Sequence, residues 1–557
     1  MRITDTSDLW WKTAVVYCLD VETFLDWNDD GVGDFAGLAQ RLDYLSELGV
    51  TCLWLTPFYP TPNRDDGYDI TDFYAVDPRL GHLGDLVEVI RTAHDRGMRV
   101  IADLVTNHTS DKHPWFVKSR SSRTSPYRDF YVWRDEPPTE QAAPVFPDQE
   151  DSNWEYDAKT EQYYQHIFYK HQPDLNITNP AVRDEIAKMM GFWLELGLSG
   201  FRVDAVPFML ETEAVVGGDK ALPDPHEYLR ALRSFLGRRS GDGVLLGEVN
   251  LPREEQERFF GGDDDGDELT MQFDFISMQK MYLSLARQDA RPLIEALLSR
   301  PAGSSDSQWA NFVRNHDELT LDKLSDEERG EVFAAFGPEE RMQVYGRGLV
   351  RRLPPMLDGD PRHVRMVYSL LFSLPGTPVL FYGEEIGMGE NLEQEGRLAV
   401  RTPMQWNRGK NGGFSDAAPS RLASPVVEGG FGPAHVNVED QRRDPDSLLN
   451  FIKTLIRHYR NAPEFGWGTF AVLEQPHSAI FAHSLTWEDR HIVAVHNFSA
   501  EPIEVPLTLT VEGESVLLDL ISGDDIELPQ TGKANITLDG YGYRWLRVVR
   551  TDDTHRY

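Results

Sequence analysis

Short apolar runs alternate with amphipathic, helix-like segments along residues 13–385 of this 557-residue chain. Segments such as 38–49, 83–97 and 182–197 place apolar residues at i, i+3, i+4 and i+7, and each ends on a glycine suited to the left-handed position after a helix. The runs are apolar on both faces, as in strands of a parallel sheet covered by helices. Eight such units predict a closed (β/α)8 TIM barrel, whose functional residues follow the carboxyl ends of the strands. The runs are residues 13–21, 51–57, 99–105, 200–206, 244–249, 271–275, 308–317 and 377–385.

The uneven spacing of the runs predicts additional domains. The stretch between the third and fourth runs is too long for one helix, so we expect a small domain inserted at 106–175. A highly charged segment with a helical pattern, 318–360, follows the seventh run. Period-two strands separated by turn residues then predict a C-terminal antiparallel β-sandwich. The predicted division is 1–105 and 176–460 for the two parts of the barrel, 106–175 for the inserted domain and 461–557 for the sandwich.

Charge and cysteine content disfavour several classes of function. The chain has 55 Lys and Arg residues against 91 Asp and Glu residues, a formal net charge of −36, which repels nucleic-acid phosphates and anionic lipid surfaces. Cys18 and Cys52 lie in apolar runs, which indicates buried thiols and not a disulfide framework. The N-terminal residues lack a secretory-signal pattern, and no apolar run reaches the ~18–20 residues of a membrane span. We therefore expect a cytoplasmic protein that binds neither nucleic acid nor membranes; a homodimer or higher homo-oligomer remains open.

Three predicted strands end on a carboxylate. Asp204 ends the fourth run, Glu248 the fifth and Asp317 the seventh. A barrel directs such residues into one shared pocket. Two carboxylates about 5–5.5 Å apart, one ionised and one with a raised pKa, are what a retaining glycosidase requires. A structural salt bridge or helix cap would account for one such acid, but three at strand ends favour a catalytic site.

Four sequence blocks resemble a known family. They are DLVTNH at 103–108, GFRVDAV at 200–206, GEVN at 247–250 and RNHDE at 314–318. In order and in strand position they resemble the signature regions of the α-amylase superfamily of glycoside hydrolases, and the similarity extends over essentially the whole chain. The resemblance implies that Asp204 is the nucleophile that forms a β-glucosyl-enzyme and that Glu248 is the general acid and then the base. It implies that Asp317 orients the sugar 2- and 3-hydroxyls and stabilises the transition state.

The resemblance also implies residues that support the nucleophile and hold the transferred glucose. Arg202 matches the family arginine that keeps Asp204 ionised. His108 and His316 match histidines that hydrogen-bond the sugar in the −1 subsite, where the transferred glucose binds.

The blind end of the pocket is implied in the same way. Asp65 together with Arg401 resembles the pair that grips the non-reducing end of the substrate, which closes the pocket behind one glucose and makes the enzyme exo-acting. Tyr68 is expected to stack under that glucose. Phe168 is expected to serve ordinary packing.

A metal site is expected in residues 26–34, which read DWNDDGVGD. Alternating oxygen donors and a glycine resemble the first half of an EF-hand loop, but Gly37 replaces the bidentate glutamate, so a full EF-hand is excluded. We expect one structural Ca²⁺, with Mg²⁺ or a metal-free turn as alternatives, and no organic cofactor. The ligands would be the side chains of Asp26, Asn28, Asp30 and Asp34 and the carbonyl of Val32. A second Ca²⁺ is predicted at Asn107, Asp174 and Glu211.

Several segments resemble the trehalose-synthase branch of the family: 172–176, 206–211, 314–333 and 346–357. This implies retaining α-glucosyl transfer on a short α-glucoside, with intramolecular conversion of maltose to trehalose through the glucosyl-enzyme on Asp204. An α-glucosidase or transglucosidase using the same residues remains the alternative. A non-catalytic interaction module would be expected to lack at least one of the three carboxylates, and all are present.

Overall fold

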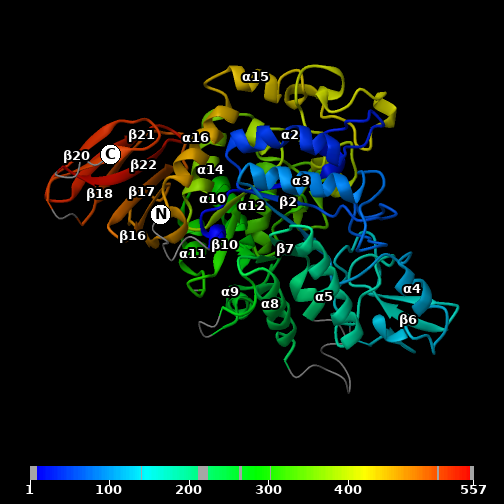
Figure 1. Cartoon of the computed structure of the whole chain (residues 1–557). Coiled ribbons are helices and arrows are strands. Elements are labelled where there is room, and N and C mark those ends of the chain that lie inside the picture. The colour runs from blue at the N-terminus through cyan, green and yellow to red at the C-terminus, as the bar shows by residue number, and fades with distance from the viewer. Residues whose placement is uncertain are drawn as a thin grey trace.

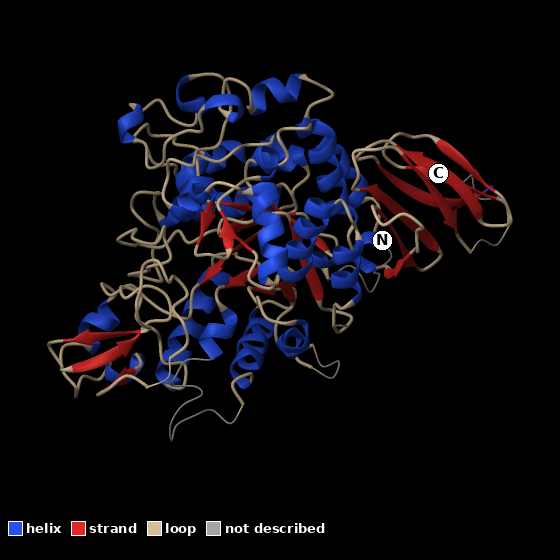
Figure 2. Cartoon of the chain, turned by 180° about the vertical axis from the view of Figure 1, so that it is seen from behind, coloured by secondary structure: helices blue, strands red, loops and turns tan. Residues whose placement is uncertain are grey.

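A closed barrel of parallel strands forms the centre of the computed structural model (Figure 1). The structure describes residues 9–139, 141–210, 224–262, 266–301, 303–510 and 513–551. Each of the predicted runs contains one barrel strand, which confirms the (β/α)8 fold, and Figure 2 shows the strands enclosed by helices. The strands, in order around the barrel, are β1 (Val16–Leu19), β2 (Cys52–Leu55), β3 (Arg99–Leu104), β7 (Gly200–Val203), β8 (Val244–Gly247), β9 (Met271–Phe273), β10 (Gln308–Phe312) and β14 (Thr377–Phe381).

The covering helices begin and end at residues that satisfy their free backbone groups. Helix α2 (Phe35–Leu48) begins after Asp34, whose carboxylate accepts the Gly37 N–H at 2.6 Å. Gly49 follows α2 with φ of 100°, the left-handed conformation predicted for it. No helix in the described ranges combines the length and apolar character needed to cross a bilayer. The other long helices are α3 (Leu83–Asp95), α5 (Pro180–Glu195), α8 (Glu227–Arg239), α10 (Phe275–Arg287), α11 (Arg291–Leu298), α14 (Pro361–Ser373) and α16 (Leu448–Arg460).

A small antiparallel sheet lies between β3 and β7, within the segment where an inserted domain was expected. Its core is aromatic: the Phe116 ring centroid lies 5.7 Å from that of Trp133 and 5.0 Å from that of Tyr164. The backbone bridge of His108 with Asp174 joins the two ends of the segment beside the barrel. The elements, in sheet order after the helix, are α4 (Pro114–Ser119), β4 (Trp133–Arg134), β6 (Gln162–Gln165) and β5 (Trp154–Asp157).

The segment after β10 contains a helix, as its pattern predicted, and a three-stranded sheet that the sequence did not predict. Helix α12 (Asp326–Phe336) begins at a capping box formed by Ser325 and Glu328. Each strand of the sheet has only two residues, which is too short for a periodic hydrophobic signal. The strands are β11 (Leu319–Thr320), β13 (Gly348–Leu349) and β12 (Gln343–Val344), and α13 (Leu353–Met356) follows them.

Antiparallel strands form the C-terminal part of the chain, as predicted. A six-stranded and a two-stranded sheet share one apolar core, to which Val493 and Leu546 contribute from the first sheet and Val505 and Leu538 from the second. This face-to-face packing is that of a β-sandwich. The six-stranded sheet runs β15 (Thr469–Val472), β16 (Ile480–Trp487), β17 (Arg490–Asn497), β22 (Tyr543–Arg550), β19 (Ser515–Asp519) and β20 (Asp525–Leu528); the other pairs β18 (Ile503–Thr508) with β21 (Lys533–Leu538).

Trp545 of β22 joins the sandwich to the barrel. Its side chain is fully buried, its indole N–H donates to the Ser369 hydroxyl on α14 at 3.0 Å, and its ring centroid lies 4.9 Å from that of Phe465. The two domains therefore share apolar surface at this point.

Replacing Trp545 by Ala should destabilise the protein strongly. Loss of a buried tryptophan leaves a cavity and costs about 3–5 kcal/mol, so we expect a clearly lower melting temperature in scanning calorimetry. Trp27→Ala is the matched control, because the Trp27 side chain is 60% exposed and its loss should change stability by about 0.5 kcal/mol or less. Equal melting temperatures for the two variants would contradict this role of Trp545.

Candidate active site

The three predicted carboxylates meet at the carboxyl end of the barrel. Asp204 directly follows β7, Glu248 directly follows β8, and Asp317 lies in the loop after β10. All three line one cavity of about 470 Å³. The cavity has the size of a small-ligand pocket, and its position is the one at which TIM barrels carry their active sites.

One buried guanidinium connects the acids on three neighbouring strands. Arg202 Nη1 lies 2.5 Å from Asp204 Oδ1 and 2.5 Å from Asp103 Oδ1, and Nη2 lies 2.8 Å from Glu248 Oε2. Burial alone would lower the pKa of Arg202, but the carboxylates, Asp103 foremost, raise it well above its usual value. Arg202 therefore stays charged, and it holds Asp204 and Glu248 next to each other.

Asp204 and Glu248 share Arg202 as a partner and have similar electrostatic environments. Burial raises the pKa of each to about 7, while Arg202 acts in the opposite direction on both. Ala205, in the left-handed conformation with φ of 48°, turns its N–H to Glu248 Oε2 at 3.0 Å. With both pKa values raised, one of the two carboxyl groups can be protonated near neutral pH while the other is ionised. One ionised and one protonated carboxyl group is the state that retaining glycosyl transfer requires.

Asp317 is in a different electrostatic environment. Burial would raise its pKa, but the positive charges of Arg397 and Arg401 act against burial and hold that pKa well below its usual range. The Nη1 of Arg397 lies 2.7 Å and the Nη2 of Arg401 3.1 Å from Asp317 Oδ1. Asp317 is therefore an ionised acceptor at neutral pH, suited to sugar hydroxyls and to a developing positive charge.

Asp65 and Arg401, which are expected to grip the non-reducing end of the substrate together, belong to one network of charged side chains but do not bond each other. Asp65 instead bonds Arg397 through Oδ1 at 2.6 Å and Gln172 through Oδ2 at 2.8 Å. Arg401 bonds Asp66 at 2.6 Å. The two arginines lie one turn apart around the 3-10 helix η6 (Gly396–Val400), so each reaches a different acid of the Asp65–Asp66 pair. Acids and arginines thus form one network at this side of the pocket. Of the two arginines, it is Arg397 that lines the cavity, together with Asp65.

Tyr68 and His108 both line the cavity, whereas His316 lies behind Tyr68. The Tyr68 hydroxyl is 2.6 Å from His316 Nε2, and the two rings are parallel. Burial lowers the pKa of His108 to about 3 and that of His316 well below its usual value, so both imidazoles are neutral. His108 Nε2 is buried and has no hydrogen-bond partner among the described residues, which leaves it available to a sugar hydroxyl.

Aromatic side chains from the two insertions cover the cavity. Phe168, for which packing was expected, instead lines the cavity, with its ring centroid 5.2 Å from that of His108. Phe146 also lines it and lies 5.0 Å from the ring of Tyr345, which belongs to the segment after β10. This contact joins two segments that are distant in the sequence beside the cavity.

Several of these residues had no assigned role in the sequence analysis, among them Asp103, Phe146, Gln172 and Arg397. Asp103 is the residue before the last of β3 and lies in one of the four family blocks, so its position near a strand end could have identified it. Gln172 likewise lies in a quoted segment. No local pattern distinguishes Phe146 or Arg397 from ordinary loop residues.

The predicted metal ligands make hydrogen bonds within the protein. Asp26 Oδ2 accepts the Gly31 N–H at 2.8 Å and the Ser415 hydroxyl at 2.6 Å, and Asp30 Oδ1 accepts the Val32 N–H at 2.9 Å. The described residues include no group of three or more His, Cys, Asp or Glu side chains arranged to hold a metal. The calcium site at residues 26–34 therefore finds no support in this arrangement and stays a prediction.

The second predicted calcium site is incomplete in the described part of the chain. The Asn107 side-chain amide donates to Asp174 Oδ1 at 3.1 Å, and burial raises the pKa of Asp174 to about 8. Glu211 lies outside the described residues. This site also stays a prediction.

Comparisons with known proteins agree with this architecture. The model of the α-amylase catalytic domain matches residues 20–331 and 352–468, and that of the sucrose hydrolase-like C-terminal domain matches 490–547. A trehalose synthase of Pimelobacter sp. (strain R48) is 42% identical, over 98% of this chain and 97% of that protein. An oligo-1,6-glucosidase of Halalkalibacterium halodurans is 31% identical, over 92% of this chain and 95% of that protein. The solved isomaltulose synthase of Protaminobacter rubrum superposes with a TM-score of 0.78 at 26% identity, over 97% of this chain and 99% of that chain. The chain therefore belongs to the α-amylase family of glycoside hydrolases.

Proposed function

We propose that the protein converts maltose to trehalose by retaining, intramolecular α-glucosyl transfer. The observation that carries the proposal is the pairing of Asp204 and Glu248 on Arg202 inside a cavity closed at one end by Asp65 and Arg397. The near full-length similarity to trehalose synthase, at 42% identity, favours this reaction over others of the family.

The first half-reaction forms a covalent glucosyl-enzyme. The non-reducing glucose of maltose binds in the closed end of the cavity, and an Asp204 oxygen attacks its anomeric carbon. The bond from that carbon to the 4-oxygen of the second glucose breaks, and Glu248 donates its proton to this oxygen. Ionised Asp317 stabilises the positive charge that develops on the sugar ring.

The second half-reaction uses the released glucose as the acceptor. The glucose turns in the cavity so that its anomeric hydroxyl attacks the anomeric carbon of the glucosyl-enzyme, while Glu248 removes the hydroxyl proton and Asp204 is released. Two inversions at one carbon give net retention, and the product is the α,α-1,1-linked disaccharide. The aromatic contact of Phe146 with Tyr345 supports this step, because a covered cavity holds the glucose and excludes water.

The alternative activity is that of an α-glucosidase or transglucosidase. It would use the same first half-reaction, followed by attack of water or of another sugar. The similarity to an oligo-1,6-glucosidase at 31% identity supports this alternative. The two activities differ only in how long the released glucose stays in the cavity.

Incubation with maltose distinguishes the two activities. We expect trehalose to accumulate well ahead of glucose when the products are followed by chromatography. Asp204→Asn removes the nucleophile and should lower the formation of both products on the order of 10⁴-fold or more. The exposed Asp489→Asn is the control and should leave both rates unchanged. Glucose without trehalose would contradict the isomerase and leave the α-glucosidase.

The pH dependence should be bell-shaped. Activity requires ionised Asp204, so kcat/KM falls as the pH drops through the pKa of the pair; it requires protonated Glu248, so kcat/KM also falls as the pH rises through it. Because the pKa of each carboxyl group is raised to about 7, the optimum should be narrow and near neutral.

Glu248→Gln tests the assignment of Glu248 as the general acid, and the test uses two substrates. With maltose we expect kcat/KM to fall by about 10²–10⁴-fold, the usual contribution of a general acid. With α-glucosyl fluoride the first step should be much less affected, because fluoride leaves without a proton. An equal loss with both substrates would show that Glu248 is not the acid.

The calcium site predicted at residues 26–34 can be tested by stability. A Ca²⁺ bound only to the folded state raises the melting temperature by mass action. The prediction therefore requires a higher melting temperature in calcium chloride than in EDTA, and it requires that Asp30→Ala removes the difference. Equal melting temperatures for the unaltered protein would contradict the site.

A further inference from the structure

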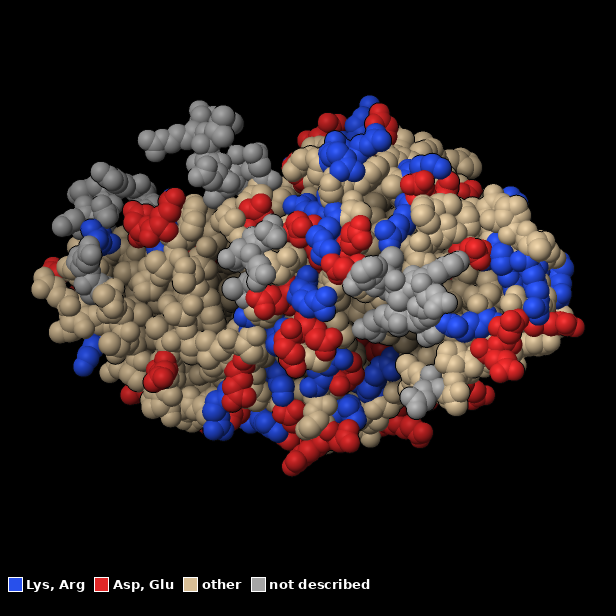
Figure 3. All heavy atoms as spheres, turned by 90° about the horizontal axis from the view of Figure 1, so that it is seen from below, with Lys and Arg blue, Asp and Glu red and all other residues tan. Residues whose placement is uncertain are grey.

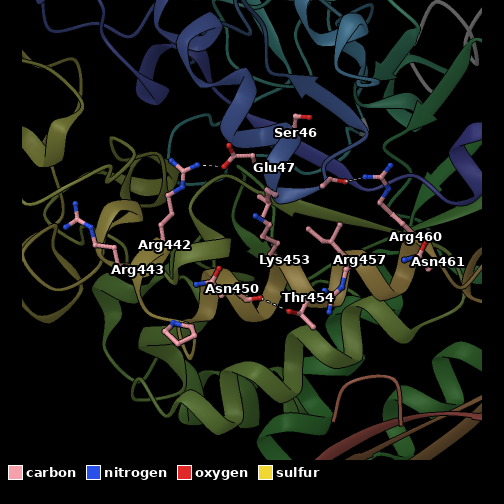
Figure 4. Close-up of a pocket in the computed structure, with 14 residues that line it drawn as sticks. Ser46, Glu47, Arg442, Arg443, Asn450, Lys453, Thr454, Arg457, Arg460 and Asn461 are labelled. Carbon is pink, nitrogen blue, oxygen red and sulfur yellow. Dashed lines mark hydrogen bonds and ion pairs between the residues drawn. The ribbon is translucent and has the colours of Figure 1, made fainter. Parts of the chain in front are cut away.

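A basic cavity lies on the outside of the barrel, away from the catalytic pocket. It has a volume of about 750 Å³ and is bordered by the end of α2, the end of α15 (Val438–Arg443) and the outer face of α16 (Figure 4). Glu47 is the only acidic side chain among its lining residues in the described part of the chain. The basic lining residues are Arg442, Arg443, Lys453, Arg457 and Arg460.

The amphipathic pattern of α16 produces one wall of this cavity. Ile452, Leu455 and Ile456 are buried in the main core. Lys453 and Arg457 lie four residues apart on the exposed side of the same helix, and such residues are neighbours on the helix surface. The exposed face of α16 is therefore positively charged over more than one turn.

Two arginine contacts hold the edges of the cavity. Arg442 is ion-paired with Glu47 at the end of α2, and Arg460 Nη1 donates to the Gly49 carbonyl at 3.3 Å. Figure 4 shows these two contacts on opposite sides, with Lys453 between them. The cavity is thus bounded by contacts between helices that lie far apart in the sequence.

Three of the five basic residues that line the cavity have no ion-pair partner among the described residues, whereas Arg442 pairs with Glu47 and Arg443 with Glu439. Lys453 and Arg457 make no ion pair with any described residue. Cations near a helix carboxyl end favour the helix dipole, which accounts for Arg457 and Arg460, but Lys453 lies in the middle of α16. Since the whole chain carries a formal charge of −36, such a cluster is unusual for it. On the face seen in Figure 3, by contrast, basic and acidic side chains intermix.

The basic surface continues beyond the cavity. A neighbouring cavity of about 380 Å³ shares Arg442 and Arg443 and adds Arg41. Burial, and then the charge of Arg442, lowers the pKa of Arg41, whose guanidinium lies 4.2 Å from the centre of the Trp406 ring. The Arg41 Nε is buried and has no hydrogen-bond partner among the described residues. The positive charge of Arg442 thus contributes to the lowered pKa of a neighbouring arginine.

We propose that this cavity binds a small, multiply charged anion of the phosphate class, at a site separate from the catalytic pocket. Phosphate oxygens accept several charge-assisted hydrogen bonds, which arginine and lysine supply together. The volume lies within the roughly 300–1,000 Å³ of small-ligand sites. Ser46, Asn450 and Thr454 add neutral polar groups to the lining, suited to the uncharged part of a phosphate ester. The neutral sugar substrate does not have the charge that this lining favours.

The test is calorimetric titration of the full chain with inorganic tripolyphosphate, with ATP and with glucose 6-phosphate, each at matched ionic strength. These three probes separate an inorganic phosphate chain, a nucleotide and a sugar phosphate as sources of the anion. We expect saturable binding of at least one probe. Lys453→Gln/Arg457→Gln removes two of the cations that have no ion-pair partner and should weaken that binding about tenfold or more, since each can no longer form a charge-assisted hydrogen bond to the anion.

The matched control is Arg490→Gln/Lys533→Gln, which removes two exposed cations from the C-terminal sandwich. It should bind the same probe with unchanged affinity. The conversion of maltose measured without the probe should be the same in both double variants, which shows that both are folded. Absence of binding by all three probes, or equal weakening in both double variants, would overturn the proposal.

Discussion

The Arg202 guanidinium is the interaction on which the active site depends. A fully buried cation and three acids crowded around it would each be costly to desolvate alone, and each is retained because it pairs with the others. The pairing has a chemical consequence. Arg202 lowers the pKa of Asp204 and of Glu248 while burial raises both, so the pair titrates near neutrality and is not locked in one charge state. Structure and reactivity thus follow from one balance of burial against charge.

A second charged network gives the pocket its shape. Asp65 and Asp66 on one side, and Arg397 and Arg401 on the other, form a wall that also reaches Asp317. Neutral sugar hydroxyls can bond to such a wall without neutralising it. The network therefore lines one part of the pocket and at the same time keeps Asp317 ionised. In the proposed reaction, the aromatic contact of Phe146 with Tyr345 favours the isomerase over the hydrolase by helping to keep the released glucose in the cavity.

Much of the fold and the three carboxylates of the site could be predicted from local sequence patterns. Apolar runs and glycine-terminated amphipathic segments gave the barrel, because strand and helix periodicities are properties of a few neighbouring residues. Asp204, Glu248 and Asp317 followed because a parallel barrel brings all its strand ends to one side. The small sheet after β10 did not follow, since strands of two residues carry no period. The ion pair of Asp65 with Arg397 did not follow from the sequence either, because the path of η6 decides which arginine reaches which acid.

The sequence by itself therefore determined the barrel, the terminal sandwich and the identity of the three carboxylates. These depend on the order of residues along single strands and helices, which the chain carries locally. The tertiary structure alone decided which arginine meets which acid, that Phe146 reaches Tyr345 over the pocket, and that α2, α15 and α16 enclose a basic cavity. Such contacts join residues hundreds of positions apart through irregular loops. Their geometry is fixed by packing in three dimensions, which the linear pattern of residue types does not specify.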